Sequence, residues 1–431
     1  MPEMFDAPMQ PAEEVQPSNP PAATALNLIE QHVHLEASRT ECCLPHLWWA
    51  GASTLAATCG RSVWTRLMGP SGPKLHPNLY VVLVGDPGQG KTLAVRSASS
   101  RFQALKIHTA ADSITGAKLI SWAAIASAKR IGEGRDPGLT IALETLDSLF
   151  ARKSDQQMKA FLSAAFDCKE EYSQDTQIRG KEPIQKLCLN LIAAATPSHL
   201  SSCFLPTDWG EGLASRFLFI LGGPGRIEDL DAFDSALDAA YLARLVALRG
   251  SLHGGLEVGW TQDAWTSRIA WRKAQNKTLP PHPHASGYWH NRHTFAVKMS
   301  MLMAIAAGES TISSTAWNQA LEALGNLEAT LATTLAHTGG NPYAGIVASV
   351  LKWALAEGRI LDEWEVRRRL SDFIAPQYIQ ATIDSMLASH QMLEVADITG
   401  PQASPNRRMI HPHLKNPGAK VWDIVKARAK A

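Results

Sequence analysis

The sequence lacks long apolar runs and an excess of charge of either sign. No apolar stretch is long and charge-free enough to span a bilayer, and the first residues lack the basic-then-apolar order of a signal peptide. The net charge of +1 argues against a nucleic-acid surface spread over the whole protein, so any such surface must be local. We therefore expect a cytoplasmic protein without a membrane partner.

Cysteine pairs and clustered metal ligands are also missing. The six cysteines contain no C-x-x-C pair and several lie in apolar runs, which is typical of buried thiols in a reducing compartment. We expect neither a zinc site nor disulfides from them. Four histidines between residues 282 and 293 have no carboxylate or cysteine at ligand spacing, so we expect no metal there either. These residues are Cys42, Cys43, Cys59, Cys168, Cys188 and Cys203, and His282, His284, His290 and His293.

What the sequence does contain is a glycine-rich loop after an apolar strand. Residues 79–92, LYVVLVGDPGQGKT, carry the spacing G-x-x-x-x-G-K-[ST]. In such a P-loop, backbone N–H groups surround phosphate oxygens, Lys91 contacts the β and γ phosphates, and the Thr92 hydroxyl ligates Mg²⁺ at a helix N-terminus. The apolar strand before the loop and the helix pattern after it favour this interpretation over an ordinary turn, so we expect ATP and Mg²⁺ as cofactors. The nucleotide-binding residues are Gly85, Asp86, Pro87, Gly88, Gln89, Gly90, Lys91 and Thr92.

Strand and helix patterns alternate around this loop, which is typical of a parallel sheet in an α/β fold. We predict five strands, with helices between them, followed by a helical region and then three helices and two short strands. The predicted strands are 80–84, 105–109, 139–143, 187–195 and 216–221, and the helices between them are 91–103, 113–128 and 156–166.

This pattern divides the chain of 431 residues into segments. The proline-rich beginning cannot bury enough surface to order itself. We predict a disordered tail at 1–24, an N-terminal helical collar at 25–70, a P-loop ATPase core at 71–227, a helical lid at 228–336, a winged helix at 343–413 and a basic C-terminal helix or tail at 414–431.

Hydrolysis of ATP needs an acidic residue at the end of a neighbouring buried strand, to hold the Mg²⁺ shell and polarise a water molecule. The stretch 139–147, LTIALETLD, supplies two carboxylates. Glu144 directly follows the strand and is the first choice as both metal ligand and catalytic residue. Asp147 comes about one turn later and is either the acid instead or a helix cap. An Asp-Glu pair is absent because Thr145 follows Glu144, so the division between metal ligand and base stays open.

Two polar residues at the ends of further strands are candidates for sensing and completing the site. Thr196 follows an apolar strand and either senses the γ-phosphate or caps a helix that begins at Pro197, or does both. Arg216 begins the next strand. It is either an arginine finger that acts on a neighbouring subunit, neutralising charge on the transferred phosphoryl group, or a surface arginine.

Other cations are candidates for contacts with DNA or nucleotide. Residues 174–184 have strand-like flanks around a glycine, which predicts a β-hairpin with Arg179 and Lys181 at its tip. Those two cations suit a single-strand phosphate backbone, although a solvated turn is equally compatible with the pattern. In the predicted lid, Arg292 and Lys298 are either nucleotide contacts or surface charges.

Together, these residues resemble the AAA+ class of P-loop ATPases. The runs PNLYVVLVGDPGQGKT, NLIAAATPSHL and EGLASRFLFI are similar to the ATPase region of primase-helicase proteins of phages and mobile elements. The Ser215-Arg216-Phe217 element and the preceding hairpin are also similar to minichromosome-maintenance helicases. The resemblance covers residues 40–320 and implies a homo-oligomeric ring, of six subunits, that moves single-stranded DNA through a central channel.

The leading hypothesis is therefore an ATP-dependent DNA helicase that acts in replication of a phage or mobile element. A primase, polymerase or initiator would be its protein partner, because no primase segment is visible. The alternative is a replication initiator or helicase loader that binds DNA and remodels a partner without unwinding. A third hypothesis, a small-molecule kinase, conflicts with the candidate trans arginine and the long helical lid. The winged helix contacts either DNA or protein.

Overall fold

The fold is described from a computed structural model. It describes residues 26–67, 69, 71–110, 114–150, 156–176, 180–204, 208–209, 212–226, 234–275, 277–278, 280–335, 344–374, 376–389, 391–395 and 408–411. The predicted tails at 1–24 and 414–431 lie outside these residues. Within the part of the chain described, no helix is both long and apolar enough to cross a membrane.

Four parallel strands form the central sheet, in the order β4 (Leu139–Leu143), β7 (Leu189–Ala195), β3 (Tyr80–Val84) and β8 (Leu218–Leu221). All residues of β3, β4 and β7 are buried, as expected of strands that are covered on both faces. The predicted α/β class is therefore confirmed. The strand that carries the P-loop lies in the interior of the sheet, between β7 and β8.

The predicted fifth strand at 105–109 is wrong. Only one bridge forms there, between Thr109 and Thr140 of β4. The helix α3 (Lys91–Ala104) extends to within one residue of Lys106, which takes a left-handed φ of 52°. Leu105 and Lys106 therefore terminate the helix, and only the few residues after them are available to pair with β4.

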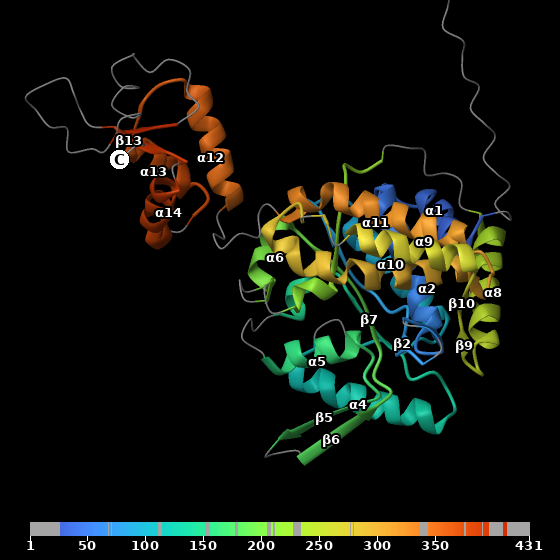
Figure 1. The fold of residues 1–431 in the computed structure, drawn as a ribbon. Helices are drawn as coiled ribbons and strands as arrows, with labels where there is room; N and C mark the ends of the chain where they lie inside the picture. Colours follow the sequence, from blue (N-terminus) through green and yellow to red (C-terminus); the bar gives the residue numbers. More distant parts are fainter. Residues whose placement is uncertain are drawn as a thin grey trace, which may run out of the picture.

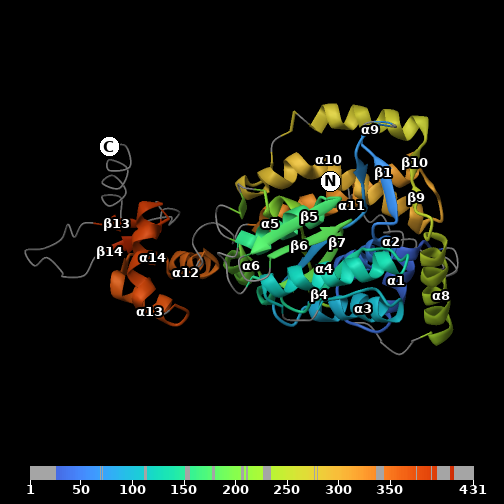
Figure 2. The same cartoon turned by 90° about the horizontal axis from the view of Figure 1, so that it is seen from below.

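Helices cover both faces of the sheet. In Figure 2, α3 and α4 (Gly116–Gly132) lie on one side, and α9 (Gln262–Gln275) and α10 (Ser286–Ala306) lie on the other. The predicted helix at 156–166 is confirmed as α5 (Gln156–Phe166). Because each face is covered, the edge at the carboxyl ends of the strands is free to present loops, which is where ligands bind in open α/β sheets.

The two N-terminal helices are part of the core and do not form a separate collar. Helices α1 (Leu28–Ala37) and α2 (Leu44–Cys59) contribute buried residues to the same hydrophobic cluster as the sheet. The end of the predicted collar also contains a strand, β1 (Val63–Arg66), which pairs with β2 (Lys74–Leu75) and with β9 (Leu256–Glu257). The segment was expected to be helical throughout, and these strands connect it to a distant part of the chain.

The predicted lid is helical but shares that core as well. It comprises α8 (Ser235–Ser251), α9, α10 and α11 (Ser314–Leu335), and the short strands β10 (Gly259–Trp260) and β11 (Thr311–Ile312). Helix α11 packs on β8 and α10 packs on α11. The buried side chains of α10 and α11 therefore belong to one cluster with those of the sheet.

A hairpin protrudes beyond α4 and α5 (Figure 1). Its strands β5 (Glu171–Thr176) and β6 (Gly180–Gln185) pair antiparallel, with Asp175 opposite Lys181. The predicted hairpin is therefore present. Its turn, which includes Arg179, lies outside the described residues, and so does the side chain of Lys181.

The C-terminal segment has a core of its own, with Val347, Ile383 and Met409 among its buried residues. The predicted three helices and two strands are present, and a third strand joins them in a sheet of order β12-β14-β13. The elements are α12 (Ala344–Glu357), β12 (Leu361–Asp362), α13 (Glu363–Ser371), α14 (Pro376–Ala388), β13 (Leu393–Val395) and β14 (Arg408–Ile410).

Candidate functional site

The P-loop follows β3 directly and ends in the first turn of α3, as the sequence predicts. The amide of Gly85 donates to the carbonyl of Ala195 at 3.2 Å, so the loop begins beside the end of β7. The α3 helix begins at Lys91, and the first amides of a helix have no acceptor within it. These amides and the positive end of the helix dipole favour a bound anion at this position.

Glycine is required at several positions of this loop. Gly88 and Gly90 take left-handed φ values of 85° and 73°, which side chains disfavour. A Cβ at Gly85 would lie 2.3 Å from Oε1 of Gln89, which accepts a hydrogen bond from the amide of Asp86. A Cβ at Gly88 would meet nothing within 4 Å, so the loop is open there. The loop is therefore curved and open in the way that a phosphate cradle requires.

Lys91 is held inside the loop. Its Nζ donates to the carbonyl of Asp86 at 2.6 Å, and only 8% of the residue is exposed. Burial lowers the pKa of this ammonium, while the nearby Asp86 carboxylate opposes that shift. A buried cation whose partner is a neutral carbonyl has charge left to offer to a phosphate.

The carboxylates expected to assist hydrolysis follow β4, whose end lies next to β7. Arg96 of α3 donates two hydrogen bonds to Glu144, from Nε to Oε1 at 2.6 Å and from Nη2 to Oε2 at 3.0 Å. This pair lowers the pKa of Glu144 and keeps it ionised. Both oxygens of the first-choice acid are therefore engaged by a cation on the helix that follows the P-loop.

Asp147, the alternative acid, lies in a short 3₁₀ helix, Leu146–Ser148. Its Oδ2 is 3.3 Å from Nδ1 of His199. Its Oδ1 is buried and has no hydrogen-bond partner among the described residues. An unpartnered carboxylate oxygen is a candidate ligand for a cation or water, so the geometry leaves both acids in consideration.

Thr196 caps the helix α6 (Pro197–Cys203), as one of the two sequence interpretations predicts. Its Oγ1 accepts from the amide of His199 at 3.3 Å and lies 3.0 Å from Oγ of Ser198. Since Thr196 follows Ala195, it also stands beside the first residue of the P-loop. Capping is therefore confirmed, and the same position is compatible with contact to a γ-phosphate.

Arg216 precedes β8, so it lies at the amino-terminal end of the parallel strands, whereas the P-loop lies at their carboxyl end. Leu221 of β8 pairs with Val84, and Arg216 comes five residues earlier, roughly 15 Å along the strand direction. Its Nη2 donates to Asp167 at 2.8 Å and its Nη1 donates to the carbonyl of Gly212 at 2.7 Å. Arg216 therefore does not touch the P-loop of its own chain.

The two lid cations are also not brought to the P-loop. Arg292 pairs with both carboxylate oxygens of Glu328 and lies over the rings of Trp271 and Trp289. The neighbouring Asn291 donates to Ser215 at 2.9 Å, which places this part of α10 at the same edge as Arg216. The predicted contact of Arg292 with the nucleotide therefore has no support within one chain.

Lys298 is neither a surface charge nor a nucleotide contact. It is 1% exposed, and its Nζ donates to Oδ1 and to the carbonyl oxygen of Asn78 at 2.7 and 2.9 Å. Burial lowers its pKa to about 8. Lys298 thus joins α10 to the residues just before β3, a structural role that its helix pattern did not indicate.

A polar cluster that the sequence motifs did not predict lies beneath the P-loop. His46 of α2 has Nε2 3.2 Å from the carbonyl oxygens of both Val84 and Ile220. Since carbonyls only accept, this nitrogen carries the proton. The two thiol sulfur atoms of Cys42 and Cys43 and a ring nitrogen of His46, which are potential metal ligands, lie within 4.8 Å of one another. All three residues are buried. The signal in the sequence is the spacing C-C-x-x-H at residues 42–46, which is not a C-x-x-C pair.

This cluster touches the loop itself. A Cβ at Gly90 would lie 3.0 Å from Cα of Cys42, so the loop packs directly on the cysteine pair. A hydrogen bond from Cys42 lowers the pKa of the Cys43 thiol to about 4, and His46 acts in the same direction. All six cysteines are buried and free, as expected.

The comparison with known proteins adds no relative. No protein-family model matches the chain, and no curated protein is similar to it at a significant level. The functional interpretation therefore depends on the geometry of the residues described above.

Proposed function

We propose that this protein is an ATP-dependent DNA translocase, and specifically a ring-forming helicase. The observation that carries the proposal is the placement of Lys91 and Arg216 at opposite edges of one parallel sheet. Because the candidate finger lies roughly 15 Å from the P-loop of its own chain, we infer that it completes the P-loop of another copy. In a homo-oligomer, such as a hexameric ring, Arg216 of one subunit would face the P-loop of the next.

ATP and Mg²⁺ fit the loop. The left-handed glycines open it, the N-terminus of α3 points amides into it, and Lys91 supplies the cation. Thr92 and Glu144 would hold Mg²⁺, which would supply positive charge to neutralise the phosphates. Glu144 orients and polarises the attacking water, Thr196 contacts the γ-phosphate, and Arg216 of the neighbouring subunit stabilises charge on the transferred group.

The Arg96–Glu144 pair would regulate this chemistry. While Arg96 donates to both oxygens of Glu144, its positive charge neutralises the carboxylate and weakens it as a base and as a metal ligand. Release of the pair would free it for hydrolysis. The pair is exposed at both ends, and so it is weak enough to exchange for other partners.

Contact with DNA is assigned to the protruding hairpin. Lys181 belongs to β6 of a two-stranded extension, and Arg179 falls between its strands in the sequence, outside the described residues. The base of the extension is fixed by Ser127 of α4, which donates to the carbonyl of Gln185 at 2.7 Å. A rigid base and a cationic tip suit a single-stranded phosphate backbone. Within a ring, six such hairpins would face a central channel.

The test is ATP hydrolysis with and without single-stranded DNA, together with strand displacement from a forked duplex. We expect turnover stimulated by DNA and unwinding, both lost in Lys91→Ala. Lys118→Ala, an exposed lysine of α4, is the matched control and should retain both. Turnover without displacement would contradict the helicase assignment.

A replication initiator or helicase loader is the second candidate. The separate core and the three-helix, three-strand order of residues 344–411 favour it, since a winged helix of this kind would bind duplex DNA. In that case, deletion of residues 343–431 would abolish duplex binding and leave basal hydrolysis. A helicase would instead keep single-strand-stimulated hydrolysis after the same deletion.

A further inference from the structure

A basic cavity, separate from the P-loop, lies at the amino-terminal end of the parallel strands. A cavity of about 740 Å³ is lined by residues that precede the strands or end the helices, including Lys186 just before β7 and Pro137 just before β4. The P-loop follows the far ends of these parallel strands. The cavity and the P-loop are therefore separate sites on opposite edges.

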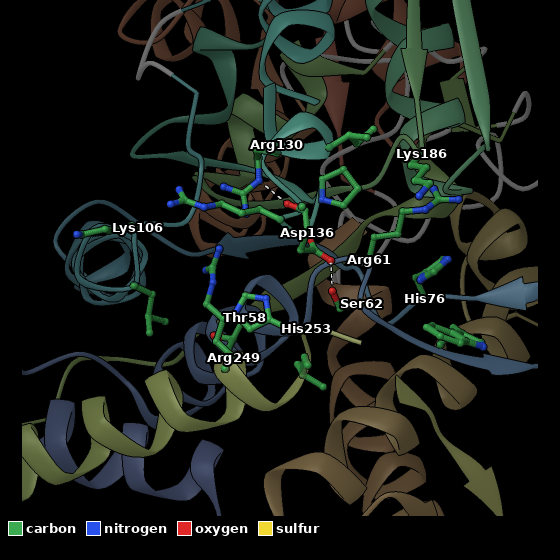
Figure 3. A pocket seen from close by; sticks show the side chains of 18 of the residues that line it. Thr58, Arg61, Ser62, His76, Lys106, Arg130, Asp136, Lys186, Arg249 and His253 are labelled. Atoms are coloured by element: carbon green, nitrogen blue, oxygen red, sulfur yellow. Dashed lines mark hydrogen bonds between the residues drawn. The ribbon is translucent and has the colours of Figure 1, made fainter. Parts of the chain in front are cut away.

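The lining is strongly cationic. Seven arginines and lysines face two carboxylates, Asp136 and Glu170. In Figure 3, Lys106 and Arg249 lie on one side of the cavity, Arg61 and Lys186 on the other, and Arg130 between them. The seven cations are Arg61, Lys74, Lys106, Arg130, Arg135, Lys186 and Arg249.

The two carboxylates are already engaged by other groups. Asp136 accepts from Ser62 Oγ at 2.6 Å and from the amide of Gly138 at 2.7 Å. Glu170 pairs with Arg61 at 2.6 Å. Among the described residues, no carboxylate pairs with Lys106, Lys186, Arg130 or Arg249. Most of the positive charge in the cavity is therefore uncompensated.

Two guanidinium groups show this most clearly. Arg130 is 6% exposed, and its one hydrogen bond among the described residues is from Nε to the carbonyl oxygen of Asp136. Nη1 of Arg249 is buried and has no hydrogen-bond partner in that part of the chain. Burial lowers the pKa of both groups; a neighbouring arginine lowers each pKa further, while the Asp136 carboxylate opposes part of this shift. Buried, unpaired cations of like charge destabilise a fold unless an anion binds between them.

We propose that this cavity binds a compact polyphosphate anion. The charges converge from separate elements on one concave space, and its volume lies within the range of small-molecule sites. Recognition is through phosphate oxygens and not through an aromatic stack. Lys74 Nζ lies 4.0 Å from the centre of the Trp64 ring, and a Cβ at Gly255 would lie 2.6 Å from the same ring. Lys74 and Gly255 therefore already pack against the indole.

The ligand is either a free polyphosphate or the phosphate chain of a nucleotide, and the two share the chemistry of adjacent phosphoryl groups. Arg130 and Arg249 would contact the innermost phosphate, since Arg130 is buried and Nη1 of Arg249 is buried without a partner among the described residues. Exposed Lys106 and Lys186 would contact the outer ones. This inference does not depend on helicase activity, because it concerns the opposite edge of the sheet.

Isothermal titration of the full chain with inorganic tripolyphosphate tests the proposal. Lys91→Ala disables the P-loop, and we expect one tripolyphosphate to bind this variant per chain. Adding Arg249→Gln and Lys186→Gln should weaken that binding at least about 10-fold, because two charge-assisted contacts are removed. Arg244→Gln, on the same helix as Arg249 but outside the cavity, should leave it unchanged. Loss of binding in Lys91→Ala alone would overturn the proposal, as would full affinity in the triple variant.

Further ligands identify the source of the phosphates. If ATP binds the Lys91→Ala variant more tightly than tripolyphosphate does, the ligand is a nucleotide; the reverse order indicates a free polyphosphate. Binding of oligothymidylate in place of tripolyphosphate would overturn the assignment to a compact anion.

Thermal unfolding separates a defect in binding from a defect in folding. We expect Arg249→Gln to melt at or above the wild-type temperature, since it removes an unpaired buried charge. In the Lys91→Ala background, where the P-loop is disabled, tripolyphosphate should raise the melting temperature of the parent and of Arg244→Gln, because a ligand that binds only the folded state stabilises it. Lys106→Gln, at an exposed position, provides a second variant that should fold normally and bind more weakly. An equal rise in all variants of the Lys91→Ala background would contradict the proposed site.

Discussion

Arg96 holds Glu144 through two hydrogen bonds, of 2.6 and 3.0 Å, and so connects the helix after the P-loop with the acid after β4. The two residues are 48 positions apart in the sequence. The pair engages both oxygens of the carboxylate that we propose as the catalytic acid. It suggests a resting arrangement in which the acid is withheld until nucleotide or a neighbouring subunit displaces the arginine.

The first prediction concerns the choice between the two acids. Glu144→Gln should lower kcat for ATP at least about 100-fold, the usual effect of removing a general base, while ATP binding remains. Asp147→Asn should retain most of the activity, because Asp147 already pairs with His199. Steady-state hydrolysis and nucleotide titration measure both. The opposite pattern would assign the acid to Asp147, whose Oδ1 is unpartnered among the described residues.

The variant Arg96→Ala tests whether the Arg96–Glu144 pair inhibits hydrolysis. The variant should hydrolyse ATP at least as fast as the wild type without DNA, since Glu144 is released. Its melting temperature should stay close to that of the wild type because the pair is exposed. A loss of turnover would instead mean that Arg96 orients Glu144 for catalysis.

The second prediction concerns action of Arg216 between subunits. Arg216→Ala should lower kcat about 10³-fold or more, in line with other arginine fingers. Mixing it with Lys91→Ala should restore part of the activity, because an intact P-loop then meets an intact arginine at some interfaces. Asp167→Asn, which removes the partner of Arg216 in the same chain, is the control and should stay active. Suppose that mixing Arg216→Ala with Lys91→Ala restores no hydrolysis and that Asp167→Asn is also inactive. The Arg216–Asp167 pair would then serve the folding of its own chain and not the neighbouring site.

The third prediction concerns the hairpin. Arg179→Ala with Lys181→Ala should abolish unwinding and DNA stimulation and leave basal hydrolysis intact. The log-log salt dependence of DNA binding should become shallower by about 0.7 for each phosphate that the variant no longer neutralises. Lys129→Ala, an exposed cation on α4, is the matched control. Unchanged unwinding would exclude the hairpin from the DNA path.

The fourth prediction compares two adjacent glycines after β8. A Cβ at Gly222 would lie 2.2 Å from the ring of His46, whereas one at Gly223 would meet nothing within 4 Å. Gly222→Ala should therefore cost about 1–3 kcal/mol of stability by overpacking and should weaken ATP binding, because His46 joins the ends of β3 and β8. Gly223→Ala should be close to neutral. Denaturant unfolding and nucleotide titration of the two variants provide the comparison, and equal effects would contradict the role of His46.

The fifth prediction concerns acid stability. Burial lowers the pKa of both His32 and His76 to about 3, against an ordinary value of 6.5. Below pH 6.5 these two histidines are protonated in the unfolded chain but stay neutral in the folded chain. The free energy of unfolding therefore falls as the pH falls from 6.5 towards 3. Each histidine contributes about 1.4 kcal/mol per pH unit in that window. Urea unfolding between about pH 7.5 and 5 should show the decline.

A variant isolates one of these histidines. His32→Gln lacks the imidazole that contacts Ser97 and Tyr241, and it should be less stable at about pH 7.5. Its stability should nevertheless fall less steeply with acid, by about one proton. A slope identical to that of the wild type would mean that His32 is protonated in the folded state.

The sequence by itself determined the features that lie within one contiguous segment. The P-loop, its strand and its helix are defined by local spacing, so they could be predicted, as could α5, the hairpin and the helices of the C-terminal segment. Thr196 as a helix cap is likewise a matter of a few neighbouring residues. In these cases apolar periodicity and backbone geometry suffice, because both act over short distances along the chain.

Only the tertiary structure decided which distant residues meet. The packing of separate elements decided four features: the end of the sheet at which Arg216 lies, the Arg96–Glu144 pair, the burial of Lys298 and the gathering of cations around the cavity. The predicted fifth strand failed for a related reason, since the length of α3 and the backbone of Lys106 competed with pairing to β4. Periodicity indicates which face of an element is buried, but it does not specify which partner buries it.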